Sequence, residues 1–81
     1  MHQTVLLFGP QARLAGKREV NLDLPDDADV AAVLRALADA EPSLVPSMNV
    51  SRLAINQDFA DADRRIGAND ELALIGLISG G

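Results

Sequence analysis

One segment, Val30 to Ala40, carries the apolar spacing of an amphipathic α-helix, and this segment limits what the rest of the chain can build. Its apolar residues recur at intervals of three and four, at Val30, Val33, Leu34, Leu37 and Ala38. Asp29 is placed to cap the helix at its start, and Glu41-Pro42 ends it. A single helix can bury such an apolar stripe only against a sheet, so the sequence predicts an α+β domain.

The other apolar residues fall in short segments that are typical of β-strands. Glu19 to Leu24 alternates between polar and apolar residues, which is the period of a half-buried strand. Thr4 to Phe8 and Glu71 to Ile78 are mainly apolar, and Arg52 to Ile55 and Phe59-Ala60 are shorter segments of the same kind. We expect these segments to pair in one sheet.

The longer connections between these elements are predicted to be irregular. Gly9 to Arg18 contains two glycines and several basic residues, so we expect a long, exposed hairpin turn between the first two strands. Ser43 to Ser51 contains Pro46 and is expected to be a loop, from which three side chains reach the core: Leu44, Val45 and Met48.

The order of the elements predicts a β-grasp (ubiquitin-like) fold, which is a mixed sheet with one main helix packed on one face. We expect a single domain over residues 1–81, with a flexible Gly-Gly tail from about residue 77. Because one helix covers only one face, apolar residues of the opposite parity are left on the other face, namely Leu6 or Phe8, Ile75 and Leu77. An apolar surface of this kind is typical of a partner interface, unless loops cover it.

The sequence ends in Ser79-Gly80-Gly81, directly after the expected final strand. Glycine has no side chain and adopts φ values that are barred to other residues, so this tail is suited to passing through a narrow channel into another protein's active site. A carboxylate becomes an acyl donor once it is activated, commonly by ATP as an acyl adenylate. Sulfur can then replace the adenylate and leave a thiocarboxylate at Gly81.

The composition excludes several other kinds of site. The chain has no cysteine, which rules out disulfides, thiolate catalysis and zinc or iron–sulfur sites built on cysteine. Its one histidine is His2, and the acidic residues Asp26, Asp27 and Asp29 lack the spacing of an EF-hand. We therefore expect no metal site and no catalytic side chain, which leaves the tail itself as the reagent.

The charge and the hydropathy of the chain also narrow the choice of partners. A net charge of -5 disfavours nucleic acid and anionic membranes, because binding either of them requires a basic patch. The N-terminus has no basic segment followed by a long apolar one, and no apolar run is long enough to cross a bilayer. Together with the lack of cysteine, these features favour a cytoplasmic location.

Short motifs spread over the whole chain carry a family resemblance. They are Leu6-Leu7-Phe8-Gly9-Pro10, Gly16-Lys17-Arg18-Glu19-Val20, Ala54-Ile55-Asn56-Gln57, Asn69-Asp70-Glu71-Leu72-Ala73-Leu74-Ile75 and Ser79-Gly80-Gly81. Together they resemble the small, sulfur-donating subunit of molybdopterin synthase, a ubiquitin-like sulfur carrier. The chain departs from that family at Ala12-Arg13, where Arg-Glu is more usual, and at Gly76-Leu77, where two prolines are usual. The loss of the prolines is expected to loosen the tail.

The resemblance implies a complete scheme for the tail. A partner enzyme adenylates Gly81 with ATP, and a sulfur relay converts it to a thiocarboxylate. Gly80 and Ser79 then thread into the large synthase subunit, where sulfur passes to cyclic pyranopterin monophosphate in molybdenum cofactor biosynthesis. The complex is expected to be a heterotetramer, with Phe8, Ile75, Leu77 and Ile78 at the partner interface. The chain would bind no cofactor and would not be catalytic alone.

Three other interpretations share some of these features. The chain could be a sulfur carrier for thiamine, cysteine or tRNA thiolation, which needs the same tail but a different client. It could also be a ubiquitin-like modifier that joins lysines through the activated tail. A plain β-grasp binding module would use no tail chemistry and would tolerate extra residues after Gly81.

Overall fold

The structure is a computed structural model that describes residues 1–77. The first two strands of the chain carry alternating apolar residues. β1 (His2–Leu7) and β2 (Glu19–Asp23) pair antiparallel, with Val5 opposite Val20. Val5, Leu7, Val20 and Leu22 are all buried, as the period-two pattern predicts. The predicted hairpin pairing of the first two strands is confirmed.

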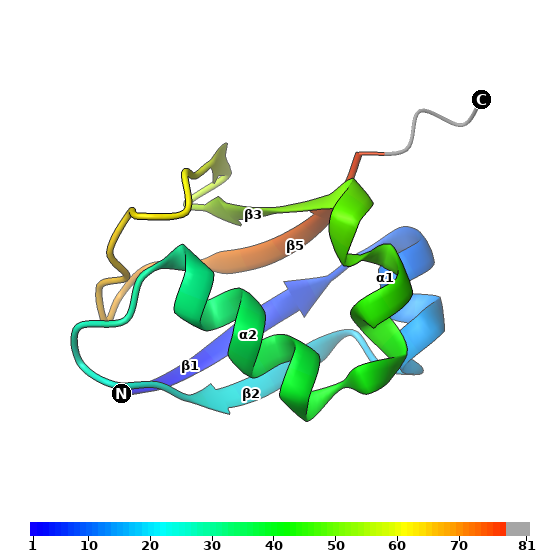
Figure 1. Cartoon of the computed structure of the whole chain (residues 1–81), viewed down its shortest axis with the longest axis horizontal. Helices are drawn as coiled ribbons and strands as arrows, with labels where there is room; N and C mark the ends of the chain where they lie inside the picture. Colours follow the sequence, from blue (N-terminus) through cyan, green and yellow to red (C-terminus); the bar gives the residue numbers. More distant parts are fainter. Residues whose placement is uncertain (78–81) are drawn as a thin grey trace.

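The other strands complete a mixed, five-stranded sheet of order β2-β1-β5-β3-β4 (Figure 1). β5 (Leu72–Gly76) lies at the centre, parallel to β1 and antiparallel to β3 (Ser51–Ile55). β4 (Asp58–Phe59) is a two-residue edge strand that pairs with β3. The final strand is therefore shorter than the predicted Glu71 to Ile78 segment, and it ends at Gly76.

The main helix, α2 (Val30–Ala40), has the predicted bounds and crosses one face of the sheet (Figure 1). Asp29 caps it, because the Asp29 carboxylate accepts a hydrogen bond from the Ala32 backbone N–H at 2.9 Å. Val33 and Leu37 are fully buried against the sheet. The core beneath the helix is aliphatic: Val5, Leu7, Val20, Leu22, Leu24, Ala28, Val30, Val33, Leu37, Leu44, Leu53, Ile55, Ile66, Leu72 and Leu74.

The predicted exposed turn from Gly9 to Arg18 is wrong, because most of this segment forms the helix α1 (Gly9–Ala15). Pro10 is tolerated in the first turn, where the backbone N–H groups lack acceptors within the helix. Gly16 ends the helix in the left-handed conformation, with φ of 70°, and its N–H donates to the Ala12 carbonyl at 2.9 Å. The side chain that anchors α1 inside the protein is the polar Gln11, so the segment has no apolar period that would have predicted a helix.

The predicted loop from Ser43 to Ser51 is also wrong, because the structure has a 3-10 helix, η1 (Pro42–Val50), in its place. At three residues per turn, Leu44 and Ser47 lie on the same side, and both are buried. Met48 packs against the core as expected. Val45 does not, since it is 53% exposed on the outer side of the turn.

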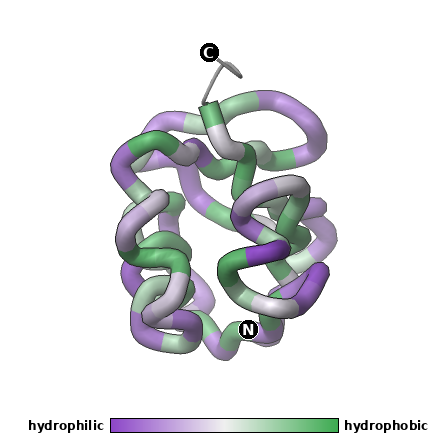
Figure 2. Tube along the Cα trace, turned by 90° about the vertical axis from the view of Figure 1, so that its right-hand side faces the viewer, coloured by the Kyte–Doolittle hydropathy of each residue, from purple (hydrophilic) through white to green (hydrophobic). Residues whose placement is uncertain are grey.

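Apolar and polar residues alternate in short stretches along the chain (Figure 2). Among residues 1–77 there is no helix with both the length and the hydropathy that crossing a membrane would require.

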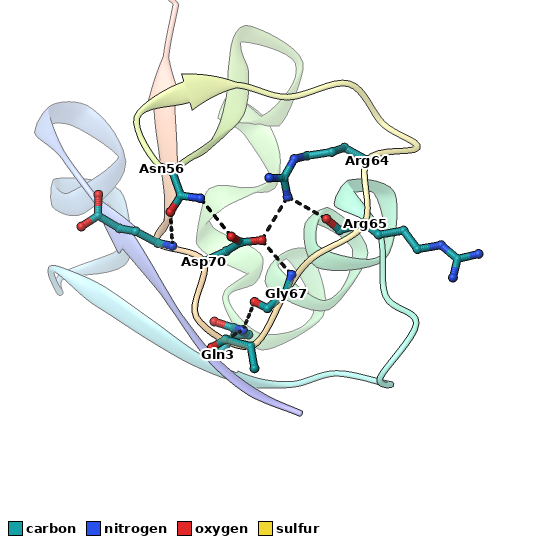
Figure 3. A network of polar contacts seen from close by, with 8 residues as sticks. Gln3, Asn56, Arg64, Arg65, Gly67 and Asp70 are labelled. Atoms are coloured by element: carbon teal, nitrogen blue, oxygen red, sulfur yellow. Dashed lines mark hydrogen bonds and ion pairs between the residues drawn. The ribbon is translucent and has the colours of Figure 1, made fainter.

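One partly buried carboxylate, Asp70, holds the loop before β5 in place (Figure 3). It accepts hydrogen bonds from the Gly67 N–H at 2.7 Å, from Asn56 Nδ2 at 2.9 Å and from Arg64 Nη1 at 3.0 Å. Asn56 Oδ1 in turn accepts the Glu71 N–H at 2.9 Å. The hydrogen bond from Gly67, then those from Asn56 and Arg64, lower the pKa of Asp70 to about 2.

The Asp70→Asn variant should lower the free energy of unfolding at pH 7 by about 1–3 kcal/mol, because charge-assisted hydrogen bonds are lost. A carboxylate with a depressed pKa stabilises the fold above its ordinary pKa of 3.8, and this stabilisation is lost as pH falls through about 2. The difference between wild type and variant should therefore shrink between about pH 4 and pH 2 in urea denaturation series. The control is Asp63→Asn, which changes an exposed carboxylate of the same loop. If the difference in unfolding free energy between wild type and Asp70→Asn did not depend on pH, this role of Asp70 would be contradicted.

Candidate functional site

The predicted reactive tail begins at Leu77, directly after β5 ends at Gly76. Ser79, Gly80, Gly81 and the predicted interface residue Ile78 lie outside the described residues. Because β5 runs parallel to β1, its C-terminal end lies at the same end of the molecule as α1 (Figure 1). The tail is thus attached to the side of the domain that α1 and η1 border.

Gly76, one of the two positions that replace the family's usual prolines, is a strand residue. It pairs with Ser51 across the β3–β5 ladder, and the next N–H, that of Leu77, donates to the Val50 carbonyl at 2.7 Å. At Gly76 and Leu77 the chain is therefore tied to the segment that leads into β3. The expected loosening concerns the residues that follow, which lie outside the described range.

The face of the sheet opposite α2 carries an apolar depression, which we call the open-face patch. It is formed by Phe8, Ala54, Phe59, Ala73 and Ile75, with Gln57 and Glu71 at its border. Ala54, Ala73 and Ile75 alternate along β3 and β5 with the buried core residues, which places them on the opposite face. The predicted residues Phe8 and Ile75 are thus brought together.

Ala54 and Ala73 of the open-face patch are buried, at 5% and 8% exposed, and the larger side chains beside them are more exposed. Phe8 is 53% exposed and Ile75 is half-buried, and Leu77, beyond the end of β5, is 47% exposed. Single exposed apolar residues are common and need no explanation, whereas an apolar depression lined by several of them is a candidate for an interaction site. Three of the residues predicted for the partner interface are therefore accessible, at least in part, in the structure: Phe8, Ile75 and Leu77.

Sequence reasoning missed Phe59, which lies on β4 and is 50% exposed. The Arg52 guanidinium lies over its ring, 5.0 Å from the centroid, and Arg52 also pairs loosely with Asp61 at 4.0 Å. A signal was available in the composition. The chain has two phenylalanines and no tyrosine or tryptophan, and aromatic residues are enriched at interfaces.

The ionisable side chains of residues 1–77 form surface pairs and one structural network. Between Met1 and Leu77, no three His, Asp or Glu side chains lie close enough together to hold a metal ion. His2 Nδ1 lies 3.4 Å from Asp23 Oδ1 on the exposed surface of the β1–β2 pair. The lowered pKa of Asp70 belongs to the structural network before β5, since its partners are Gly67, Asn56 and Arg64.

Solved structures share this architecture. The crystal structure of SAMP1 from Haloferax volcanii superimposes with a TM-score of 0.89 at 31% identity, and the match covers 100% of both chains. The complex of subunits 1 and 2 of the molybdopterin-converting factor from Helicobacter pylori 26695 gives a TM-score of 0.71 at 21% identity, again over 100% of both chains. The predicted β-grasp fold is confirmed.

Sequence comparisons agree with the structural ones. The molybdopterin synthase sulfur carrier subunit of Dictyostelium discoideum is 36% identical over 80 residues, which covers 95% of this chain and 93% of the relative. The ThiS family matches residues 5–81, a range that includes Ser79, Gly80 and Gly81. The chain therefore belongs to the ThiS family of ubiquitin-like sulfur carriers.

Proposed function

We propose that this chain is the sulfur carrier subunit of molybdopterin synthase and that it delivers sulfur as a thiocarboxylate at Gly81. The observation that carries the proposal is the end-to-end match to a sulfur carrier subunit, together with a family match that runs through the Gly80-Gly81 pair. The position of that pair, a few residues after the central strand β5, supports it.

The chemistry proposed for Gly81 proceeds in balanced steps. The Gly81 carboxylate attacks the α-phosphate of ATP on a partner adenylating enzyme, which releases pyrophosphate and leaves an acyl adenylate. The outer sulfur of a persulfide donor then attacks the acyl carbon and displaces AMP, and a thiol cleaves the resulting acyl disulfide to leave the thiocarboxylate and a disulfide. In the synthase the thiocarboxylate sulfur bonds to a carbon of cyclic pyranopterin monophosphate and displaces an oxygen group from it, and water then cleaves the acyl C–S bond, which leaves the sulfur on the pterin and restores the Gly81 carboxylate. Gly80 and Ser79 supply the narrow thread that brings this group into each active site.

The domain body would dock on the large synthase subunit through the open-face patch. Two half-exposed phenylalanines and the half-buried Ile75 supply the apolar centre that stable interfaces use, and Arg52, Gln57 and Glu71 supply a polar rim. The similar Helicobacter pylori protein is part of a complex of subunits 1 and 2, which supports a large-subunit partner. We propose the same pairing here, as a heterotetramer.

The tail chemistry is tested by changing its length. Removing Gly81 shortens an extended thread by about 3.5 Å, and a misplacement near 1 Å can cost about a hundredfold in rate. Adding an alanine after Gly81 places the carboxyl beyond the site. Wild type from cells with an active sulfur relay should show exchange of one terminal oxygen for sulfur by intact mass, whereas both variants should fold normally and show none. Full sulfur transfer by either variant would refute the tail mechanism.

The open-face patch is tested by Ile75→Asp. Ile75 is half-buried and lies opposite Arg52 in the β3–β5 ladder, so the new carboxylate has a cation beside it and the domain should fold. Binding to the large subunit should weaken by about thirtyfold or more, measured by calorimetry. Val45→Asp places the same change on an exposed apolar residue of η1, outside the patch, and should bind normally. Equal affinity for wild type and Ile75→Asp would show that the patch is not the docking surface.

Protein modification is a second candidate function, favoured by the relation to an archaeal modifier. Small archaeal modifier protein 1 of Haloferax volcanii is 36% identical over 86 residues, which cover 93% of this chain and 95% of that protein. A modifier would leave the Gly81 carboxyl joined to lysines of other proteins. Immunoprecipitation of a tagged chain from its own cells, followed by peptide mass spectrometry, should then find the tail on lysine; a chain that carries sulfur but no such linkage would be a carrier alone.

A further inference from the structure

A buried polar side chain, Gln11, lies beneath the point where the tail leaves the sheet. Gln11 belongs to α1 and is 1% exposed. Its Nε2 donates to Ser51 Oγ at 3.3 Å, and Ser51 Oγ donates to the Ser47 carbonyl at 2.8 Å. This chain of hydrogen bonds links α1, β3 and η1: the side-chain amide is held by Ser51, and Ser51 is in turn held by Ser47.

The same amide packs directly against Gly76. A Cβ atom built on Gly76 would lie 2.7 Å from Gln11 Nε2, 2.8 Å from Oε1 and 3.1 Å from Cδ. Gly76 shares the parity of Leu72 and Leu74, whose side chains point into the core, so its missing side chain faces α1. The amide of Gln11 thus occupies the place that a side chain at position 76 would take.

Gln11 and the end of η1 together hold the base of the tail. On one side Gly76 contacts the Gln11 amide, and on the other the Leu77 N–H donates to the Val50 carbonyl at 2.7 Å. We propose that Gln11 is a positioning residue for the reactive terminus: its amide, packed against Gly76, sets the direction in which the chain leaves β5.

A small rotation at the base of the tail would displace Gly81 by a large distance. Gly81 is four residues beyond Leu77 in the sequence, a span of roughly 14 Å when the segment is extended inside a partner. A rotation of about 10° at Gly76, five residues before the end of such a thread, would move its far end by about 3 Å, and errors near 1 Å already reduce the rates of positioned reactions. The expected effect on sulfur transfer rests on the proposed function, but the contact between Gln11 and Gly76 can be tested without sulfur chemistry.

Gln3 provides a matched control for Gln11. It is also a buried glutamine, 5% exposed, and its Nε2 donates to the Gly67 carbonyl at 2.9 Å. It lies at the start of β1, at the opposite end of the sheet from Gly76 (Figure 1). Gln3→Ala therefore removes a buried amide of the same kind without touching the base of the tail.

The first experiment measures amide hydrogen exchange by NMR. In Gln11→Ala the Leu77 N–H should exchange about tenfold faster or more, relative to the Leu74 N–H in the same strand. Gln3→Ala should leave the ratio of the two rates as in wild type. An unchanged ratio in Gln11→Ala, or the same change in Gln3→Ala, would overturn the proposal.

The second experiment tests whether Gln11 and Gly76 act through each other. Gly76→Ala should accelerate Leu77 exchange in the wild-type background, because its Cβ pushes the amide away. In the Gln11→Ala background it should have little further effect, since the space is already free. Effects that simply add would mean that the two residues do not act as one contact.

The third experiment addresses the consequence for transfer. With the open-face patch intact, Gln11→Ala should lower kcat for sulfur donation about tenfold at an unchanged KM for the carrier, while Gln3→Ala should change neither. If Gln11→Ala has a normal kcat and the wild type is active, the positioning role of Gln11 is refuted and the proposed function stands. If wild type transfers no sulfur at all, the proposed function fails, and the exchange ratio still decides whether Gln11 holds the base of the tail.

Discussion

The parallel pairing of β1 with β5 is the constraint on which the rest of the structure depends. It sets Val5 opposite Leu72, so that strands from the two ends of the chain lie side by side at the centre of the sheet. Everything between them, including α2, η1 and β3, forms the connection that a parallel pair requires. The same pairing decides that β5 finishes beside α1, and so it determines which surfaces surround the base of the tail. Pairing between such distant segments is also intrinsically slow to form.

Periodicity was enough to predict the elements whose buried residues are apolar. The helix from Val30 to Ala40 and the strand around Val20 and Leu22 were found because their core residues repeat at the helical and strand periods. The order of these elements then predicted a mixed sheet with a helix on one face. The composition and position of Gly80-Gly81, with the resemblance that they complete, predicted a carrier.

The features that the sequence did not reveal depend on polar anchors or on distant contacts. α1 was missed because its buried side chain is Gln11, and η1 because its repeat of three residues holds Leu44 beside the polar Ser47. The Asp70 network joins residues up to 15 positions apart, so it has no local pattern. Phe59 was predicted to lie in a short strand, but its place on the open face was not predicted, because a strand of two residues is too short to show which face each residue takes.

The placement of the aromatic residues has an optical consequence. The core is aliphatic, the chain has no tyrosine or tryptophan, and both phenylalanines are about half exposed on the open face. The near-ultraviolet bands of this protein therefore arise from the open-face patch and not from its interior. The fine structure of those bands should change when a partner covers Phe8 and Phe59, whereas loosening of the core should change it little. In most proteins such bands report folding; here they would report partner binding.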